Sequence, residues 1–260
     1  MTEEPYRWLE AMGNRREYVR DQLKGGAPAF AVSLPDGILL LGVSAGGAPG
    51  KVFEIHDRLA MAALGHPSDL ERVRQAAIDA AHVEAFTRAP EDVSLRRLVA
   101  YGLSASVKQN FEQLFSAPVL GEFLFAEVGP SQDRDLLMRL GFDGSFSACP
   151  GGVGVVAGDS DAEKAAAGWL QGALKDVTDR FAAARLLLEA GWVLSQGRSF
   201  GADLPPLAER EAGWREALSG KSLELGWLRR DPSRAVRYET LSPAEVPGDD
   251  RGAAAPLPAA

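Results

Sequence analysis

The chain has 260 residues, of which 46% are hydrophobic and 25% are charged, and its net charge is −8. A chain of this length buries either one large core or two small ones. An acidic surface does not attract phosphate groups, so the charge argues against nucleic acid and anionic membranes as partners.

The sequence lacks the features that are typical of membrane and secreted proteins. No run approaches the roughly 18 apolar residues of a membrane-spanning helix. The N-terminal stretch begins with acidic residues and lacks the apolar core of a signal peptide. Cys149 is the single cysteine, which excludes an internal disulfide and a cysteine-based metal cluster. We therefore expect a cytoplasmic protein with no membrane partner.

The N-terminal quarter of the chain predicts one helix and four strands. Apolar positions on one side predict a helix over residues 5–24, which stops at Gly25-Gly26. Two strands follow within residues 27–45, about the turn signal Pro35-Asp36-Gly37. A second pair of strands is predicted over residues 51–55 and 59–64.

Two long helices are predicted next. The first has Ser68 as its expected N-cap, with Glu71 completing a capping box, and it ends before Pro90. The second covers residues 91–115. Its apolar stripe consists of Leu95, Leu98, Val99, Leu103, Val107 and Phe111.

The second half of the chain repeats this order. Strands are predicted within residues 120–129, 135–150 and 151–158, with a hairpin turn at Asp143-Gly144. Two helices follow within residues 159–174 and 176–197. A looser segment over residues 198–221 holds one short helix, and a last hairpin spans residues 222–242. The Pro- and Ala-rich tail from residue 243 is expected to be disordered.

The order of strands, two helices, strands, two helices and strands predicts two sheets packed face to face. A helix pair then covers each outer side, which gives a four-layer αββα sandwich of the α+β class. A strand with one face in solvent alternates apolar and polar residues. The run GILLLGV is apolar almost throughout, which is typical of a strand in a sheet that is buried on both faces.

Several sequence blocks resemble one known family in order and spacing. REYVRDQLKGG resembles a leader helix that ends EYA-x-KG-x-x-RG, and KVFEIHDRLAMAALGHPSDLERV resembles the block KI-x-x-IDD-x-I-x-x-x-x-SG-x-x-AD-x-x-x-L. LMRLGFDGSF, DAEKAAAGWL and LELGWLRRDPSRAVRYETLSPAEV resemble later blocks. Over residues 8–246 the chain thus resembles proteasome core-particle subunits, in particular the α-type subunits of bacterial proteasomes.

This resemblance implies the αββα fold of N-terminal-nucleophile hydrolases with an added leader helix. It divides the chain into three parts: a gate segment and leader helix over residues 1–26, the αββα domain over residues 27–242, and the disordered tail over residues 243–260.

Catalytic members of the family carry a threonine with a free α-amino group where the first strand begins, beside a lysine and an aspartate. In this chain that location falls at Ala27 or Pro28, and neither side chain has a hydroxyl. Val43 and Ser44 stand where the acidic residue is expected. Lys51 matches the family lysine but has no nucleophile to activate, so we expect no catalytic residue. We also expect no metal and no cofactor, because His82-Val-Glu84 is not a zinc-binding His-Glu-x-x-His pair and Gly151-Gly152-x-Gly154 lacks the context of a dinucleotide site.

Two alternative functions stay open. The first is an active N-terminal-nucleophile peptidase. Its nucleophile would be Thr2, exposed by removal of Met1, or an internal residue exposed by cleavage of the chain. About 25 residues separate Thr2 from the first strand, however, so its amine is not held at a strand tip. The other alternative is a ring-forming scaffold with no protease partner, which is suggested by departures from the family pattern in the Gly- and Ala-rich loop SAGGAPG, at His66 and in segment 198–221.

The resemblance implies that the chain forms the outer, seven-membered ring of a protein-degrading particle, stacks on β subunits and docks an ATPase or other ring activator. Residues 1–7 would form the gate. The apolar face of the leader helix would contact a neighbour in the ring, although the same face could instead pack on its own domain. This face consists of Trp8, Leu9, Met12, Tyr18 and Val19.

An activator-docking pocket is also implied by the resemblance. Lys51 matches a lysine that pairs with the C-terminal carboxylate of an activator tail, a suitable role for a buried ammonium group. Gly26 matches a small residue that allows the tail backbone to approach. His66 stands where the family more often has an apolar residue. The simpler interpretation of Lys51 is a solvated lysine at a strand edge.

Overall fold

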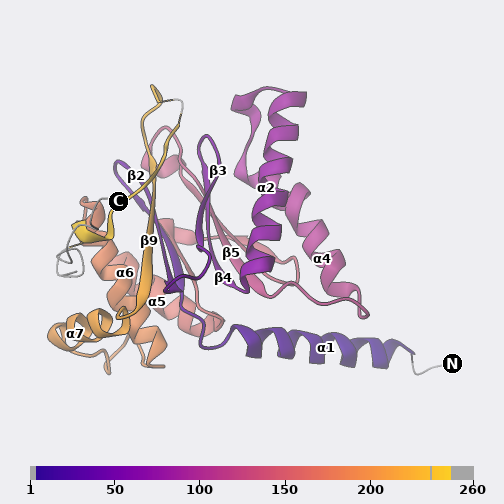
Figure 1. Cartoon of the computed structure of the whole chain (residues 1–260), viewed down its shortest axis with the longest axis horizontal. Helices are drawn as coiled ribbons and strands as arrows, with labels where there is room; N and C mark the ends of the chain where they lie inside the picture. The colour runs from indigo at the N-terminus through magenta and orange to yellow at the C-terminus, as the bar shows by residue number, and fades with distance from the viewer. Residues whose placement is uncertain (1–3, 235, 247–260) are drawn as a thin grey trace, which may run out of the picture.

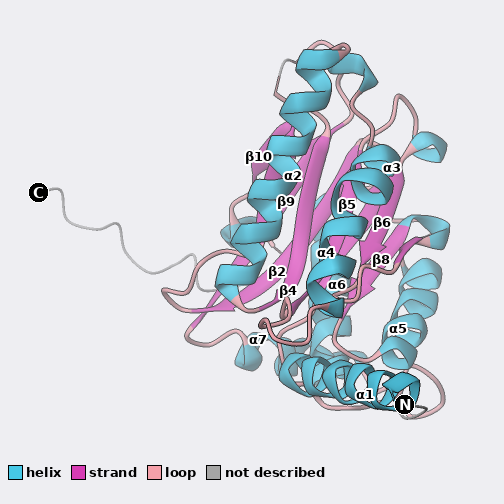
Figure 2. Ribbon diagram, turned by 90° about the vertical axis from the view of Figure 1, so that its right-hand side faces the viewer, coloured by secondary structure: helices cyan, strands magenta, loops and turns pink. Residues whose placement is uncertain are grey.

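Two five-stranded antiparallel sheets pack face to face between two layers of helices (Figure 1, Figure 2). The computed structural model describes residues 4–234 and 236–246. Sheet one has the order β10 (Tyr238–Thr240), β9 (Lys221–Arg229), β2 (Gly37–Ala45), β1 (Ala29–Leu34) and β8 (Val153–Val156). Sheet two has the order β3 (Val52–His56), β4 (Leu59–Gly65), β5 (Gly121–Glu127), β6 (Leu136–Leu140) and β7 (Phe146–Ala148).

The helices form the outer layers and the leader. Sheet one is covered by α5 (Ser160–Ala173), α6 (Arg180–Ser195) and α7 (Leu207–Ala217), and sheet two by α2 (Pro67–Thr87), α3 (Leu95–Arg97), the π-helical turn η2 (Leu98–Leu103) and α4 (Ser104–Glu112). The leader helix α1 (Glu4–Leu23) projects from one end of the sandwich (Figure 1). Short 3₁₀ turns are η1 (Pro90–Asp92), η3 (Gln132–Arg134), η4 (Pro150–Gly152) and η5 (Pro243–Glu245).

Each strand contributes to two cores because successive side chains point to opposite faces of a sheet. In β1, Phe30 and Val32 pack under the helices of sheet one, whereas Ala29 and Ala31 pack between the two sheets. The inner face is rich in alanine, which leaves little side-chain volume between the sheets. The predicted four-layer αββα sandwich is confirmed.

Three predicted details differ from the structure. Helix α2 begins at Pro67 with His66 at the N-cap, and no side chain caps it, so the capping box predicted at Ser68 is wrong. The helix predicted over residues 91–115 is interrupted by the π turn η2 and ends at Glu112. The tail predicted from residue 243 begins with η5, and Val246 is buried in the core. The remainder of the tail, 247–260, lies outside the described residues.

A buried ion pair joins the two sheets at the end of β1. Arg230 donates two hydrogen bonds to the carboxylate of Asp135, at 2.6 and 2.8 Å, and the Asp135 side chain is only 2% exposed. The same carboxylate accepts hydrogen bonds from the Ser33 hydroxyl and from the Gly129 amide. Arg230 follows β9 in sheet one and Asp135 precedes β6 in sheet two, so this pair holds the two sheets together.

We predict that Arg230→Ala lowers the free energy of unfolding by about 3–5 kcal/mol, because it leaves the buried Asp135 carboxylate without its cation. Urea unfolding followed by circular dichroism measures this change. The control is Arg234→Ala, which removes an exposed ion pair with Asp231 and should cost no more than about 1 kcal/mol. Equal losses in the two variants would contradict a special role for the Arg230–Asp135 pair.

Candidate functional site

The site begins where the chain passes from α1 into β1. Gly25 has a left-handed backbone (φ +77°), which turns the chain after the last residue of the helix. Ala27 is half-buried and Pro28 is buried at the start of the strand. The polypeptide is therefore continuous at this point, and these two residues carry neither a free α-amino group nor a hydroxyl or thiol.

The structure places Lys51 close to this strand start. Ala29, the first residue of β1, pairs with Gly42 of β2. A Cβ atom on Gly42 would lie 3.2 Å from Cβ of Lys51, which precedes β3 in the opposite sheet. The lysine thus lies against the first strands of the sandwich. Ala27 and Pro28, at the nearby strand start, have no nucleophilic side chain.

Glu224 of β9 organises the surroundings of Lys51. One carboxylate oxygen accepts hydrogen bonds from the backbone amides of Lys51 (2.6 Å) and Val52 (3.1 Å). The other oxygen accepts the hydroxyl hydrogen of Ser44 at 2.7 Å. Ser44, which stands where an acidic residue was expected, is buried and therefore serves as a donor to Glu224.

Sequence reasoning missed Glu224. The signal was an acidic residue between Leu223 and Leu225 in the strand sequence SLELGWL. A carboxylate among apolar strand residues has to find hydrogen-bond donors, and here two of its donors are backbone amides of the opposite sheet.

Burial lowers the pKa of the Lys51 ammonium below its ordinary value. The nearby charge of Glu224 acts in the opposite direction and raises it, whereas the like charge of Lys221 lowers it further. A partly desolvated ammonium is stabilised by any anion that reaches it. Chemically, the site can therefore bind an anionic group, while Ala27 and Pro28 at the strand start supply neither a hydroxyl nor a thiol.

The predicted docking residues gather at one end of β4. The carbonyl of Lys51 accepts a hydrogen bond from the Ala63 amide (3.0 Å). Gly26 is packed so closely on Leu64 that a Cβ atom there would collide with the leucine side chain. His66 is exposed just beyond the strand, and its amide donates to the carbonyl of Leu120. Of the three, only Gly26 lines a cavity between the start of sheet one and the helices α6 and α7.

The predicted ring-contact residues of α1 divide into two groups. Trp8, Leu9 and Tyr18 are exposed, with 45%, 68% and 50% of their surface accessible. Val19 is fully buried between the two sheets of its own domain, and Met12 packs partly against the same core. Packing on its own domain is thus observed for Met12 and Val19, whereas contact of the exposed face with a neighbour stays a prediction. Residues 1–3 of the predicted gate lie outside the described residues.

Within residues 4–234 and 236–246, no three His, Cys, Asp or Glu side chains come together as metal ligands. No helix in the described part of the chain has the length and apolarity to cross a bilayer.

We predict that Lys51 titrates below 10.5, because burial disfavours its charged form. Since its pKa is lower in the folded than in the unfolded state, the contribution of Lys51 to stability grows as the pH rises through the interval between the two values. ¹³C NMR of the reductively methylated protein follows the methyl signal that disappears in Lys51→Arg. In Glu224→Gln the same signal should titrate lower still. A pKa at or above 10.5 would contradict the burial of the ammonium.

Comparisons with known proteins agree with this geometry. The chain is 34% identical over 173 residues to the proteasome subunit alpha of Renibacterium salmoninarum, covering 65% of this chain and 69% of the relative. Over 229 residues it is 31% identical to the proteasome subunit alpha of Actinosynnema mirum and 30% identical to that of Geodermatophilus obscurus. These two alignments cover 88% of this chain and 80% and 74% of the relatives. No protein-family model matches the chain. On these similarities, the chain belongs to the family of proteasome alpha subunits.

Proposed function

We propose that this chain is a non-catalytic subunit that forms the outer ring of a cytoplasmic, protein-degrading core particle. The ring is heptameric, and catalysis belongs to the β subunits on which it stacks. The observation that carries this proposal is the strand start at Ala27 and Pro28, where the chain continues into α1 and has no nucleophilic side chain. An N-terminal-nucleophile mechanism needs both a free amine and a nucleophile there.

Exposed apolar side chains support assembly with other subunits. Trp8, Leu9 and Tyr18 are exposed on the projecting leader helix. On the helix layer over sheet two, Val83, Phe86 and Tyr101 are also largely exposed. Large apolar side chains gathered on a surface are typical of protein–protein contacts. We assign the first group to the neighbour within the ring and the second to the β ring.

We predict that this protein, mixed with the proteasome β subunit of the same cell, forms a stacked barrel that cleaves peptides. Negative-stain electron microscopy and a fluorogenic peptide assay measure assembly and cleavage. Leu9→Asp should reduce the assembled fraction at least tenfold, because it places a charge in an apolar contact. Glu10→Gln, at the next position of the same helix, is the control. A chain that remains monomeric with every β partner would contradict the proposal.

Gating is tested in the same particle. The N-terminal segment leads into a helix at one end of the sandwich (Figure 1), and we propose that residues 1–7 narrow the axial entrance. Deletion of residues 2–7 should raise the rate of peptide cleavage several-fold while leaving the assembled fraction unchanged. An unchanged rate would exclude a gate in this segment.

Activator docking is proposed for Lys51, Gly26 and His66. Their common position at the end of β4 and the partly desolvated ammonium of Lys51 support binding of a terminal carboxylate. We predict that Lys51→Ala weakens activator binding to the assembled particle about tenfold or more, whereas Lys175→Ala, a change in an exposed lysine after α5, does not. Surface plasmon resonance measures both. Equal affinities would show that the ammonium of Lys51 does not bind the tail.

A further inference from the structure

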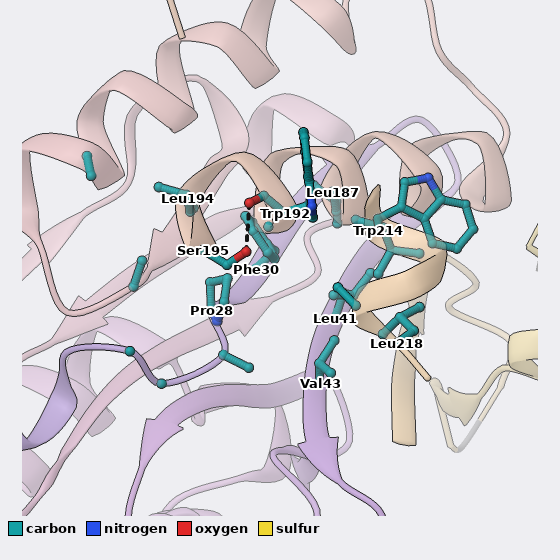
Figure 3. A pocket seen from close by; sticks show the side chains of 18 of the residues that line it. Pro28, Phe30, Leu41, Val43, Leu187, Trp192, Leu194, Ser195, Trp214 and Leu218 are labelled. Carbon is teal, nitrogen blue, oxygen red and sulfur yellow. Dashed lines mark hydrogen bonds between the residues drawn. The ribbon is translucent and has the colours of Figure 1, made fainter. Parts of the chain in front are cut away.

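A cavity of about 370 Å³ lies between the start of sheet one and the helices α6 and α7 (Figure 3). Phe30 of β1 and Leu41 of β2 form its sheet wall, and Leu187 of α6 and Trp214 of α7 form its helix wall. Protein cores are normally packed without voids much larger than a water molecule. A volume of this size is instead in the range of small-molecule binding sites.

The α7 wall comes from segment 198–221, one of the places where the sequence departs from the pattern of the family. Residues 198–221 contain α7, and both Trp214 of this helix and Leu218, its C-cap residue, line the cavity. Gly213 allows the close packing of α7 on α6, because a Cβ atom there would collide with the ring of Trp192, another lining residue. Segment 198–221 therefore supplies, through α7, one wall of an apolar cavity.

Two polar side chains of the lining already have partners, whereas the buried indole Nε1 of Trp214 has no hydrogen-bond partner. The hydroxyl of Ser195 donates to the carbonyl of Trp192 at 2.7 Å (Figure 3). Asp159 caps α5, and its carboxylate accepts hydrogen bonds from the amides of Asp161 and Ala162. The interior thus presents mostly apolar surface to a ligand.

Two lysines and one aspartate are the charged residues of the lining, and the charges of Asp21, Glu17 and Asp159 act on Lys24. Lys24 and Lys221 are exposed and line the cavity, and Asp159 is the acidic lining residue. Lys24 also forms an exposed ion pair with Asp21, a type of contact worth little in free energy, so it can exchange for another anion. Lys221 is near enough to Lys51 to affect its pKa. An apolar interior below a cationic rim is complementary to an amphipathic anion.

We propose that this cavity binds a small amphipathic carboxylate, a fatty-acid-like molecule whose apolar chain enters between the sheet and α7 and whose carboxylate faces Lys24 and Lys221. The proposal does not depend on ring assembly or activator docking, because every residue of the cavity belongs to one chain. Its mouth is shared with Gly26, so an occupant would lie next to the proposed docking residues.

Decanoate, used below its micellar concentration, is the probe. Trp192 and Trp214 line the cavity, so binding should change the intrinsic fluorescence, and calorimetry should give one site per chain. Ala217→Phe fills the cavity and should weaken binding at least tenfold. Ala76→Phe adds the same side chain at an exposed position of α2 and should leave it unchanged. Circular dichroism checks that both variants fold.

Two further variants keep the test decisive. Gly191→Val fills the cavity from α6, where an added Cβ meets Phe30 at an ordinary 3.4 Å, and it should also weaken binding. Decanol should bind at least fivefold more weakly than decanoate, and Lys221→Gln should reduce that difference. Absence of saturable binding, or equal binding by folded Ala217→Phe and the unmodified chain, would overturn the proposal. Equal affinity for decanol and decanoate would overturn the role of the lysines.

Discussion

The continuous peptide chain between α1 and β1 is the constraint on which the function of this protein depends. In the N-terminal-nucleophile architecture the reactive group is the first residue of the first strand, and its own amine is the base. Here the leader helix occupies that place, and Ala27 and Pro28 stand at the strand start. The fold therefore keeps the αββα framework, while Glu224 near the strand start accepts a hydrogen bond from Ser44 and joins the two sheets through hydrogen bonds from backbone amides.

Two carboxylates hold the sandwich together at opposite ends of β1. Near its start, Glu224 of sheet one accepts hydrogen bonds from backbone amides of sheet two. Near its end, Asp135 of sheet two binds Arg230 and Ser33 of sheet one. Hydrogen bonds to a charged acceptor are stronger than those between neutral groups. These contacts fix the spacing of the sheets, and Glu224 also positions the lysine to which we assign activator docking.

Much of this fold could be predicted from the sequence because groups of strands and pairs of helices alternate along the chain. The run GILLLGV and the order of strands and helix pairs were sufficient for the αββα sandwich. The π turn was not predicted. Leu95, Val99, Leu103 and Val107 recur every four residues, whereas an ideal α-helix has 3.6 residues per turn, and the wider turn η2 keeps this stripe buried. Glu224 was missed because its partners are distant in sequence and become visible only when the sheets pack.

The most direct test of a non-catalytic α subunit is the intact mass of the purified protein before and after treatment with an electrophilic peptide epoxyketone, which captures N-terminal threonine nucleophiles. We expect the mass of the full chain, with or without Met1, and no adduct at any concentration of the reagent. A shortened chain that begins at a Thr, Ser or Cys, or a stoichiometric adduct, would contradict this account of the strand start.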